Sequence, residues 1–270
     1  MICFPNAKIN LGLNIVSKRP DGYHNIETIF YPVPVKDALE IVPAIANESF
    51  TQTGISVDGP AENNLVVKAL GAFRQKYTIP PLEIHLLKAI PFGAGLGGGS
   101  ADAAFMLKLV NTYCALGLTT EQLEEIAQSI GSDCPFFIRN TPVFATGTGN
   151  LFTPISLSLK GYHFCLVKPN VTVSTPEAYA LVSPKAPVLS LQEIIQMPVS
   201  SWKEYMVNDF EESVFTRYPV IADWKEKLYQ AGAVYASMSG SGSSVFGLFE
   251  EAVSVKNLFP DSFVWEGVLP

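Results

Sequence analysis

The chain has little of several features that would define its class. Its 270 residues include four cysteines and three histidines, and only 16% of the residues are charged. Cys3, Cys114, Cys134 and Cys165 are scattered without CxxC spacing. We therefore expect reduced thiols in a reducing compartment, and neither a zinc site nor a disulfide framework. No stretch reaches about 18 consecutive apolar residues, which argues against a transmembrane helix.

Positive charge is also scarce, and this narrows the range of partners. There are 18 Lys and Arg residues against 25 Asp and Glu residues, and the net charge is −7. Such a chain repels nucleic acid and anionic membrane, so we expect neither as a partner. The start, MICFPNAKIN, shows no charged leader region or cleavage site. These absences predict a cytoplasmic protein that acts on small molecules, and leave open whether it is a monomer or a homodimer.

Glycine, by contrast, is concentrated in the stretch IPFGAGLGGGSADAA, residues 90–104. Glycines adopt φ > 0 easily and let backbone N–H groups lie against the oxygens of a ligand. We expect Ser100 to cap the helix that follows, and the start of a helix favours phosphate. The residues expected to form this anion cradle are Pro91, Phe92, Gly93, Ala94, Gly95, Leu96, Gly97, Gly98, Gly99, Ser100 and Ala101.

Three interpretations of this stretch compete. A flexible linker is disfavoured, because the glycines lie between an apolar strand and an amphipathic helix. A dinucleotide fingerprint fits Gly93, Gly95 and Gly98, but it needs an acid at the end of a following strand, and residues 112–130 look helical. A Walker A loop needs a lysine just before Ser100, and glycine stands there. A nucleoside-triphosphate loop of another class remains.

Three further segments carry candidate chemistry. Residues 7–16 alternate, so that Lys8 and Asn10 share a polar face that either meets solvent or faces a ligand. Asp133 lies in the turn GSDCPFF, where an Asx turn or a helix cap competes with a chemical role. A second glycine-serine stretch at residues 239–244 suggests a second phosphate-bearing group.

Periodicity and capping residues predict the other elements. Strands are expected at residues 26–30, 38–42, 49–57, 82–90 and 162–167. Helices are expected at residues 63–77 with Asn63 as cap, from Ser100 to about Gly117, from the Thr119–Gln122 capping box to Gly131, after Thr175 as cap, after the Ser190–Glu193 pair, and at residues 208–216 and 220–230. Weak periodicity over residues 148–160 predicts a domain boundary there.

In order along the chain, PNAKINLGLNI, IPFGAGLGGGSADAA and SMSGSGSSVFGLF resemble the three motifs of the GHMP kinase superfamily, which includes galactose, homoserine, mevalonate and phosphomevalonate kinases. The resemblance implies a two-domain α+β fold. An N-terminal ATP-binding domain, residues 1–155, would contain a left-handed β-α-β unit. A smaller C-terminal α/β domain would span residues 156–270, with the active site in the cleft between the domains.

The resemblance also implies roles for single residues. ATP, as its Mg²⁺ complex, would be the phosphoryl donor, and the glycine stretch would hold its triphosphate. Lys8 and Asp133 would be the catalytic pair, with Asn10 beside them. The segment RPDGYH resembles a branch whose acceptor alcohol carries a cytidine diphosphate. The residues expected to bind this acceptor or close over the phosphates are Asn10, Tyr23, His24, Tyr179, Ser239, Gly240, Ser241 and Gly242.

No side chain is assigned as a metal ligand. Another GHMP small-molecule kinase, of the homoserine or mevalonate type, remains an alternative. A nucleotide-binding homologue without turnover is the alternative from a different class of protein.

Overall fold

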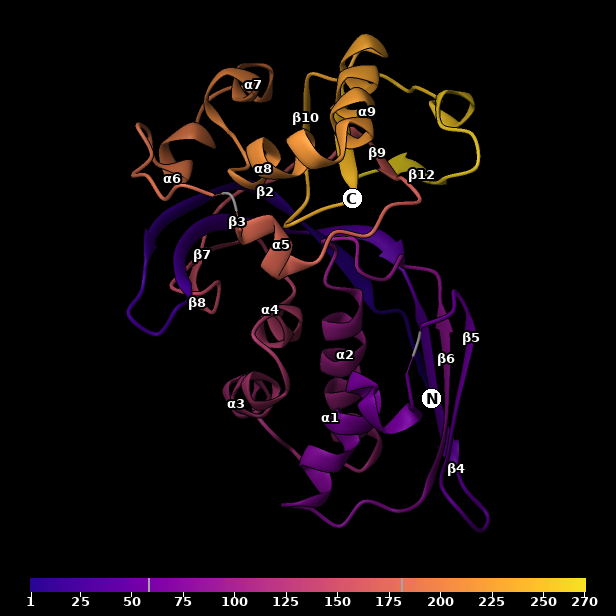
Figure 1. Ribbon diagram of the computed structural model, residues 1–270. Helices are drawn as coiled ribbons and strands as arrows, with labels where there is room; N and C mark the ends of the chain where they lie inside the picture. Colours follow the sequence, from indigo (N-terminus) through magenta and orange to yellow (C-terminus); the bar gives the residue numbers. More distant parts are fainter. Residues whose placement is uncertain (58, 181) are drawn as a thin grey trace. The chain divides into compact units, whose positions relative to one another are not determined.

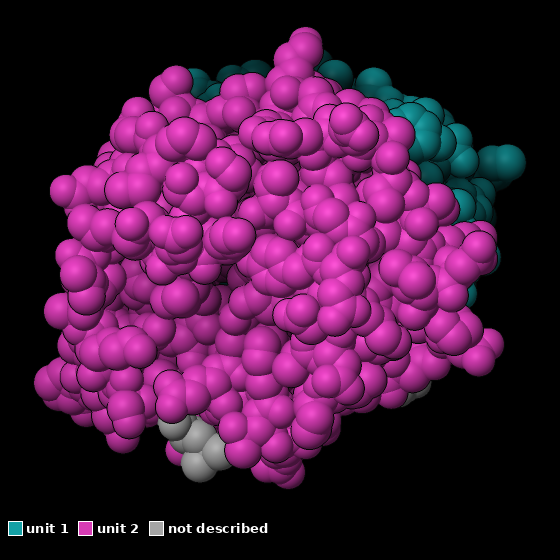
Figure 2. All heavy atoms as spheres, turned by 90° about the horizontal axis from the view of Figure 1, so that it is seen from above, with its two compact units in different colours: residues 1–7, 35–92, 97–141 teal, residues 8–34, 93–96, 142–270 magenta. Residues whose placement is uncertain are grey.

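The computed structural model describes residues 1–57, 59–180 and 182–270. The chain forms two compact units (Figure 2). Unit 1 contains residues 1–7, 35–92 and 97–141, and unit 2 contains residues 8–34, 93–96 and 142–270. The first glycine stretch thus contributes four residues to unit 2 and the rest to unit 1.

Unit 1 is built on a four-stranded sheet whose strand order is β1-β4-β6-β5. Its strands are β1 (Ile2–Cys3), β4 (Ala38–Pro43), β5 (Ser49–Gly54) and β6 (Leu82–Lys88). Strands β5 and β6 are parallel and are joined through η1 (Ala61–Asn63) and α1 (Leu65–Arg74), which makes a β-α-β unit. Leu82, Ile84 and Leu86 of β6 are buried, as period-two alternation requires.

The helices of unit 1 cover one face of this sheet (Figure 1). They are α1, α2 (Gly98–Tyr113), α3 (Thr120–Ile130) and α4 (Cys134–Arg139). The predicted capping box of Thr119 and Gln122 is confirmed, and α3 ends before Gly131. The predicted cap at Asn63 is wrong by one residue, because the side chain of Asn64 accepts the Val66 N–H at 2.9 Å.

Most of the sheet of order β2-β3-β7-β8 belongs to unit 2. Its strands are β2 (Asn6–Lys18), β3 (His24–Lys36), β7 (Val143–Thr146) and β8 (Leu151–Pro154). Every residue of β2 from Asn6 to Ile15 is buried. The polar face of this strand is therefore not a solvated one, and that alternative is excluded.

The second sheet of unit 2 is antiparallel, with the strand order β10-β11-β9-β12. Its strands are β9 (His163–Lys168), β10 (Tyr235–Met238), β11 (Val245–Phe249) and β12 (Phe263–Val268). The helical elements described in this unit are α5 (Thr175–Tyr179), α6 (Leu191–Ile194), η2 (Val199–Ser201), α7 (Trp202–Tyr205), α8 (Phe210–Arg217), α9 (Pro219–Gln230) and η3 (Lys256–Leu258). Helix α9 packs on β10 and β11.

Capping residues explain where the short helices of unit 2 begin. The Ser190–Glu193 capping box is confirmed at the start of α6. The predicted cap at Thr175 is wrong by one residue, since the Ser174 side chain accepts the Glu177 N–H instead. Across the described residues, no helix combines the length and the apolar character needed to cross a bilayer.

Candidate functional site

The first glycine stretch runs from the end of β6 to the start of α2. Gly93, Gly95 and Gly97 have φ values of 61°, 75° and 68°, in the left-handed region that glycine tolerates best. Helix α2 begins at Gly98 with Gly97 as its cap, so the expectation that Ser100 caps the helix is wrong. Ser100 lies in the first turn instead.

The first turn of α2 supplies the donors that a phosphate needs. The N–H of Ala101 makes the first bond of the helix, 2.9 Å from the Gly97 carbonyl oxygen. The N–H groups of Gly98, Gly99 and Ser100 precede that bond, and these residues are partly exposed. In the rest of the stretch Pro91, Ala94 and Leu96 are buried, whereas Phe92 is exposed. The geometry thus offers three adjacent N–H groups at a helix start, which is suited to an anion.

Lys8 and Asn10 lie side by side on β2 in unit 2, and both are buried. The Lys8 ammonium donates to Asn10 Oδ1 at 2.7 Å and lies 4.5 Å from the centre of the Phe30 ring. Asn10 Nδ2 donates in turn to the Thr28 hydroxyl at 2.9 Å, and that hydroxyl donates to the Gly12 carbonyl. The Lys8 N–H is bonded to the Leu96 carbonyl at 2.9 Å, which ties β2 to the glycine stretch. A buried amino group is thus held in one orientation.

Asp133 lies in unit 1, at the residue that precedes α4. This is the N-cap position, yet within the described part of the chain its side chain makes no capping hydrogen bond. Its neighbour Cys134 is buried, which raises the pKa of that thiol to about 11 and keeps it protonated at neutral pH. The helix-cap interpretation of Asp133 therefore finds no support in the local geometry.

The second glycine-serine stretch joins β10 to β11 in unit 2. Ser239, Gly240 and Gly242 are buried, and Ser241 is partly exposed. The Ser239 hydroxyl donates to the Gly95 carbonyl at 2.8 Å and accepts the Asn10 N–H at 3.3 Å. The Ser241 hydroxyl lies 3.4 Å from that of Thr175. The stretch thus contacts both β2 and the first glycine stretch through protein hydrogen bonds.

Three aromatic side chains proposed for the acceptor lie in unit 2. His24 and Tyr179 stack with their ring centres 4.7 Å apart and 14° between their planes. Phe210 meets the Tyr179 ring edge-on at 4.7 Å. Tyr23, at the turn before β3, is 67% exposed. His24 and Tyr179 are therefore brought together as an aromatic pair, with Tyr23 next to His24 in the chain.

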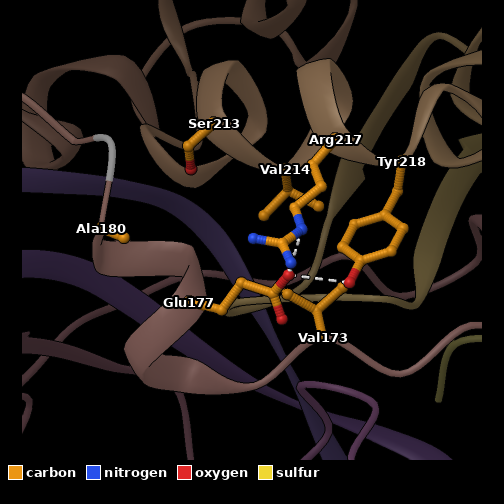
Figure 3. Close-up of a pocket in the computed structure, with 7 residues that line it drawn as sticks. All are labelled: Val173, Glu177, Ala180, Ser213, Val214, Arg217 and Tyr218. Atoms are coloured by element: carbon orange, nitrogen blue, oxygen red, sulfur yellow. Dashed lines mark hydrogen bonds and ion pairs between the residues drawn. The ribbon is translucent and has the colours of Figure 1, made fainter.

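A small hollow of about 120 Å³ lies between α5 and α8 (Figure 3). It is lined by Val173, Glu177, Ala180, Ser213, Val214, Arg217 and Tyr218. Glu177 accepts the Tyr218 hydroxyl at 2.8 Å, and this hydrogen bond, together with the Arg217 charge at 2.6 Å, lowers the pKa of Glu177. The hollow is too small for a nucleotide. Its polar contacts hold α5, the helix that carries Tyr179.

Sequence reasoning missed a buried charged cluster in unit 1, made of Asp37, Lys88 and Asp102. In the sequence, the only indication of this cluster was an acidic residue, Asp102, within an alanine-rich helix. Across the described residues, no group of three or more His, Cys, Asp or Glu side chains is placed to hold a metal ion.

Comparisons with known proteins show the family of this chain. The family model "GHMP kinases N terminal domain" matches residues 64–141, and "GHMP kinases C terminal" matches residues 190–259. A protein of Parabacteroides distasonis named 4-diphosphocytidyl-2-C-methyl-D-erythritol kinase is 72% identical over the whole of both chains. A protein of the same name from Bacteroides fragilis is 60% identical over 92% of each chain.

A solved structure shares the fold of this chain. A crystal structure of 4-(cytidine 5'-diphospho)-2C-methyl-D-erythritol kinase matches with a TM-score of 0.82 and 29% identity, over 100% of this chain and 99% of the other. The predicted two-domain α+β fold is confirmed. The chain belongs to the GHMP kinase family.

Proposed function

We propose that this chain is an ATP-dependent kinase that phosphorylates the 2-hydroxyl of 4-(cytidine 5'-diphospho)-2-C-methyl-D-erythritol, a step of the non-mevalonate route to isoprenoid precursors. The observation that carries the proposal is the 72% identity, over the full length of both chains, to a protein named for this substrate. Membership of the GHMP kinase family supplies ATP as the phosphoryl donor.

On the donor side, residues 91–101 bind the triphosphate, and the N–H groups of Gly98, Gly99 and Ser100 are its main donors. Each charge-assisted hydrogen bond contributes about 1.5–3 kcal/mol, so a few of them hold a triphosphate without a cluster of lysines. ATP would bring Mg²⁺ as part of its complex; the ion would be held through the phosphates and water and would neutralise charge on the phosphoryl group.

In the transfer step, Asp133 accepts the proton of the 2-hydroxyl as that oxygen attacks the γ-phosphorus. The bond from the γ-phosphorus to the bridging oxygen breaks, and ADP leaves with the electron pair. The Lys8 ammonium stabilises the negative charge on the transferring phosphoryl group. Asn10 supports this role, because its amide oxygen already accepts a hydrogen bond from Lys8.

On the acceptor side, Tyr23, His24 and Tyr179 recognise the cytidine. A cytosine ring needs an aromatic face and a hydrogen-bonding edge. The stacked pair of His24 and Tyr179 supports the first need, and stacking on an aromatic side chain is worth about 1–3 kcal/mol per base. Residues Ser239, Gly240, Ser241 and Gly242 close over the phosphates, with Ser241 the most accessible of them.

Several further properties belong to the same proposal. The family domains divide at residues 155 and 156, which lies between the segments that the two family models match. The net charge of −7 supports a small-molecule enzyme that binds neither nucleic acid nor membrane. The scattered cysteines support a location in the cytoplasm. The protein acts as a monomer or a homodimer.

An acceptor panel tests the function. Purified protein, ATP and Mg²⁺ are combined with the diphosphocytidyl substrate, free methylerythritol phosphate, mevalonate, homoserine or galactose, and ADP release is measured. We expect kcat/KM to be far higher for the first acceptor than for the others. Equal use of an acceptor without cytidine would move the chain to another GHMP kinase activity, and no ADP release with any acceptor would indicate a binding protein without turnover.

Asp133→Asn tests the chemistry. It keeps the shape of the side chain but removes the proton acceptor, so kcat should fall about 10²–10⁴-fold while both substrates still bind. Steady-state kinetics and calorimetric titration with an ATP analogue measure the two effects. Turnover near the wild-type rate would leave Asp133 with only a structural role.

A further inference from the structure

A buried charged cluster in unit 1 has no part in the chemistry above. The Lys88 ammonium donates to Asp37 Oδ2 and, at 2.7 Å, to Asp102 Oδ2. The exposed fractions of these side chains are 4% or less. Asp37 lies between β3 and β4, Lys88 ends β6, and Asp102 lies in α2. The cluster therefore joins three separate segments of the unit through charged hydrogen bonds.

Asp37 holds the start of the glycine stretch. Its Oδ1 accepts the N–H of Ala89 at 2.6 Å and the N–H of Ile90 at 2.8 Å. The N–H of Asp37 itself donates to the Pro5 carbonyl at 2.8 Å. The backbone that leaves β6 is thus held by a carboxylate that is itself anchored to the N-terminal segment.

The same cluster holds the far end of the stretch, where α2 begins. Lys88 binds Asp102, one turn after Gly98. A Cβ added to Gly98 would lie 3.3 Å from the Lys88 nitrogen and 2.9 Å from Ile90 Cγ2. The first residue of α2 is therefore seated directly on Lys88 and Ile90, and both ends of residues 91–97 are fixed by the same three side chains.

The electrostatics of the cluster favour a geometric role over a purely stabilising one. Burial raises the pKa of Asp102 to about 8. The Lys88 charge lowers this pKa, and the Asp37 charge raises it. Asp102 Oδ1 has no hydrogen-bond partner among the described residues. Apolar side chains of similar volume often stabilise a fold as well as a buried ion network does. The hydrogen bonds that Lys88 donates to the two carboxylates are directional, however, and fix the orientation of the joined segments better than apolar packing does.

We propose that Asp37, Lys88 and Asp102 are positioning residues that hold both ends of residues 91–97, so that the first turn of α2 presents its N–H groups to the donor phosphates. The proposal rests on the proposed role of that stretch in binding ATP. The cluster does not touch substrate. Its loss should therefore change the use of ATP and leave the acceptor unaffected.

The test compares Asp102→Ala with Asp102→Asn in steady-state kinetics, varying ATP and the acceptor separately. Asp102→Ala removes the link to Lys88, and the misplaced loop should raise KM for ATP about 10- to 100-fold. KM for the acceptor should stay within about twofold of wild type. Asp102→Asn keeps an oxygen that accepts from Lys88 and should restore most of the ATP affinity. Equal KM values for ATP in wild type and Asp102→Ala would overturn the proposal.

A matched control separates positioning from loss of stability. Leu123 is a buried residue of α3, a different helix of unit 1, so Leu123→Ala destabilises the same unit away from the cluster. It should leave KM for ATP unchanged at a temperature well below its Tm. If Leu123→Ala raises KM for ATP as much as Asp102→Ala does, the cluster is merely structural.

A second variant covers the case in which Asp102→Ala does not fold. The triple variant Asp37→Asn, Lys88→Met and Asp102→Leu leaves no buried charge in the cluster. It should fold and still show the raised KM for ATP, and an unchanged KM would overturn the proposal. Gly97→Val, which alters the stretch itself, separates the two hypotheses. If Gly97→Val weakens ATP binding and the cluster variants do not, only the positioning role fails; if Gly97→Val also has no effect, the ATP role of the stretch fails.

Discussion

The two glycine-rich stretches are similar in composition and different in what their polar groups contact. In the first, Gly97, Gly98, Gly99 and Ser100 are partly exposed at the start of a helix of 16 residues. In the second, the buried hydroxyls of Ser239 and Ser243 donate to carbonyls of Gly95 and Val171. The first stretch presents the N–H groups that precede the first bond of α2, whereas Ser239 and Ser243 of the second use their hydroxyls to brace the protein.

Even within the first stretch, glycine serves two purposes. Gly97 needs its left-handed backbone, with φ of 68°. At Gly95 a Cβ would lie 1.9 Å from the Ser239 carbonyl oxygen, so a side chain is excluded by the second stretch. Composition alone therefore does not separate a glycine that approaches a ligand from one that approaches another part of the chain.

The largest expected effect is on the first stretch. Gly97→Val should weaken ATP binding at least about 100-fold, because a β-branched residue is strained at φ > 0 and crowds the space of the phosphates. The fold should survive. Calorimetric titration with a non-hydrolysable ATP analogue measures the affinity, and circular dichroism confirms the fold.

Gly71→Val is the matched control for this variant. Gly71 lies in α1 of unit 1, and a Cβ there would meet nothing within 4 Å. The same substitution at this position should leave ATP affinity unchanged. If a folded Gly97→Val protein binds the ATP analogue with unchanged affinity, the first stretch is not part of the ATP site. The proposed difference between the two stretches would then be wrong.

Ser239→Ala should act mainly on stability. It leaves the Gly95 carbonyl and the Asn10 N–H without their shared hydroxyl in a buried place. The free energy of unfolding should fall by about 1–3 kcal/mol, the penalty for such unsatisfied groups, with a smaller effect on catalysis. Urea denaturation measures the free energy of unfolding, and Ser254→Ala, at an exposed serine, is the control. A variant of normal stability with a large loss of phosphate binding would instead make Ser239 a ligand contact.

The side chains that hold the two stretches in place also differ in their response to pH. Burial raises the pKa of Asp102 to about 8 from an ordinary 3.8, so between these values the folded state keeps a proton that the unfolded state loses. Stability from this group therefore falls as pH rises through that window, by up to about 1.4 kcal/mol per pH unit. Lys88 and Asp37 face this carboxyl, and the Cys3 thiol lies within electrostatic range of it.

Asp102→Asn removes this titration, while the serine hydroxyls of the second stretch do not titrate at all. The free energy of unfolding of the variant should thus depend less on pH between about 4 and 8 than that of wild type. Denaturation curves at several pH values provide the comparison. Parallel pH profiles for the two proteins would show that Asp102 is ionised in the folded state.

Local patterns predicted much of the fold, including the backbone elements around the proposed donor site. The strand, glycine stretch and helix at residues 82–113 and the two capping boxes depend on neighbouring residues, and the sequence contains those. The start of α2 was misplaced, because serine is a common cap and the left-handed Gly97 takes that role instead. The helix starts predicted at Asn63 and Thr175 moved by one residue, because a second capping residue, Asn64 or Ser174, stands next to each and takes the role.

Long-range contacts could not be predicted. Asp37 and Lys88 are 51 residues apart, and the Ser239 hydroxyl meets a residue 144 positions away. Whether the polar face of β2 meets solvent depended on the rest of the fold, and alternation alone left both answers open. Catalytic roles for Lys8 and Asp133 came from the family resemblance and stay predictions.

The smallest expected effect is at Ser241, which tests whether any part of the second stretch serves a ligand. Among the serines of residues 239–244 it is partly exposed, and its hydroxyl has only a long contact with Thr175 at 3.4 Å. Loss of one partly exposed hydrogen bond is worth about 0.5–1.5 kcal/mol, so Ser241→Ala should raise KM for one substrate by about two- to tenfold and leave stability unchanged. Steady-state kinetics with each substrate varied in turn would show which substrate the serine meets. If neither KM changes, the second stretch has only a structural role. If Ser241→Ala weakens substrate binding as much as Gly97→Val weakens ATP binding, the second stretch is a second phosphate-binding loop of equal importance.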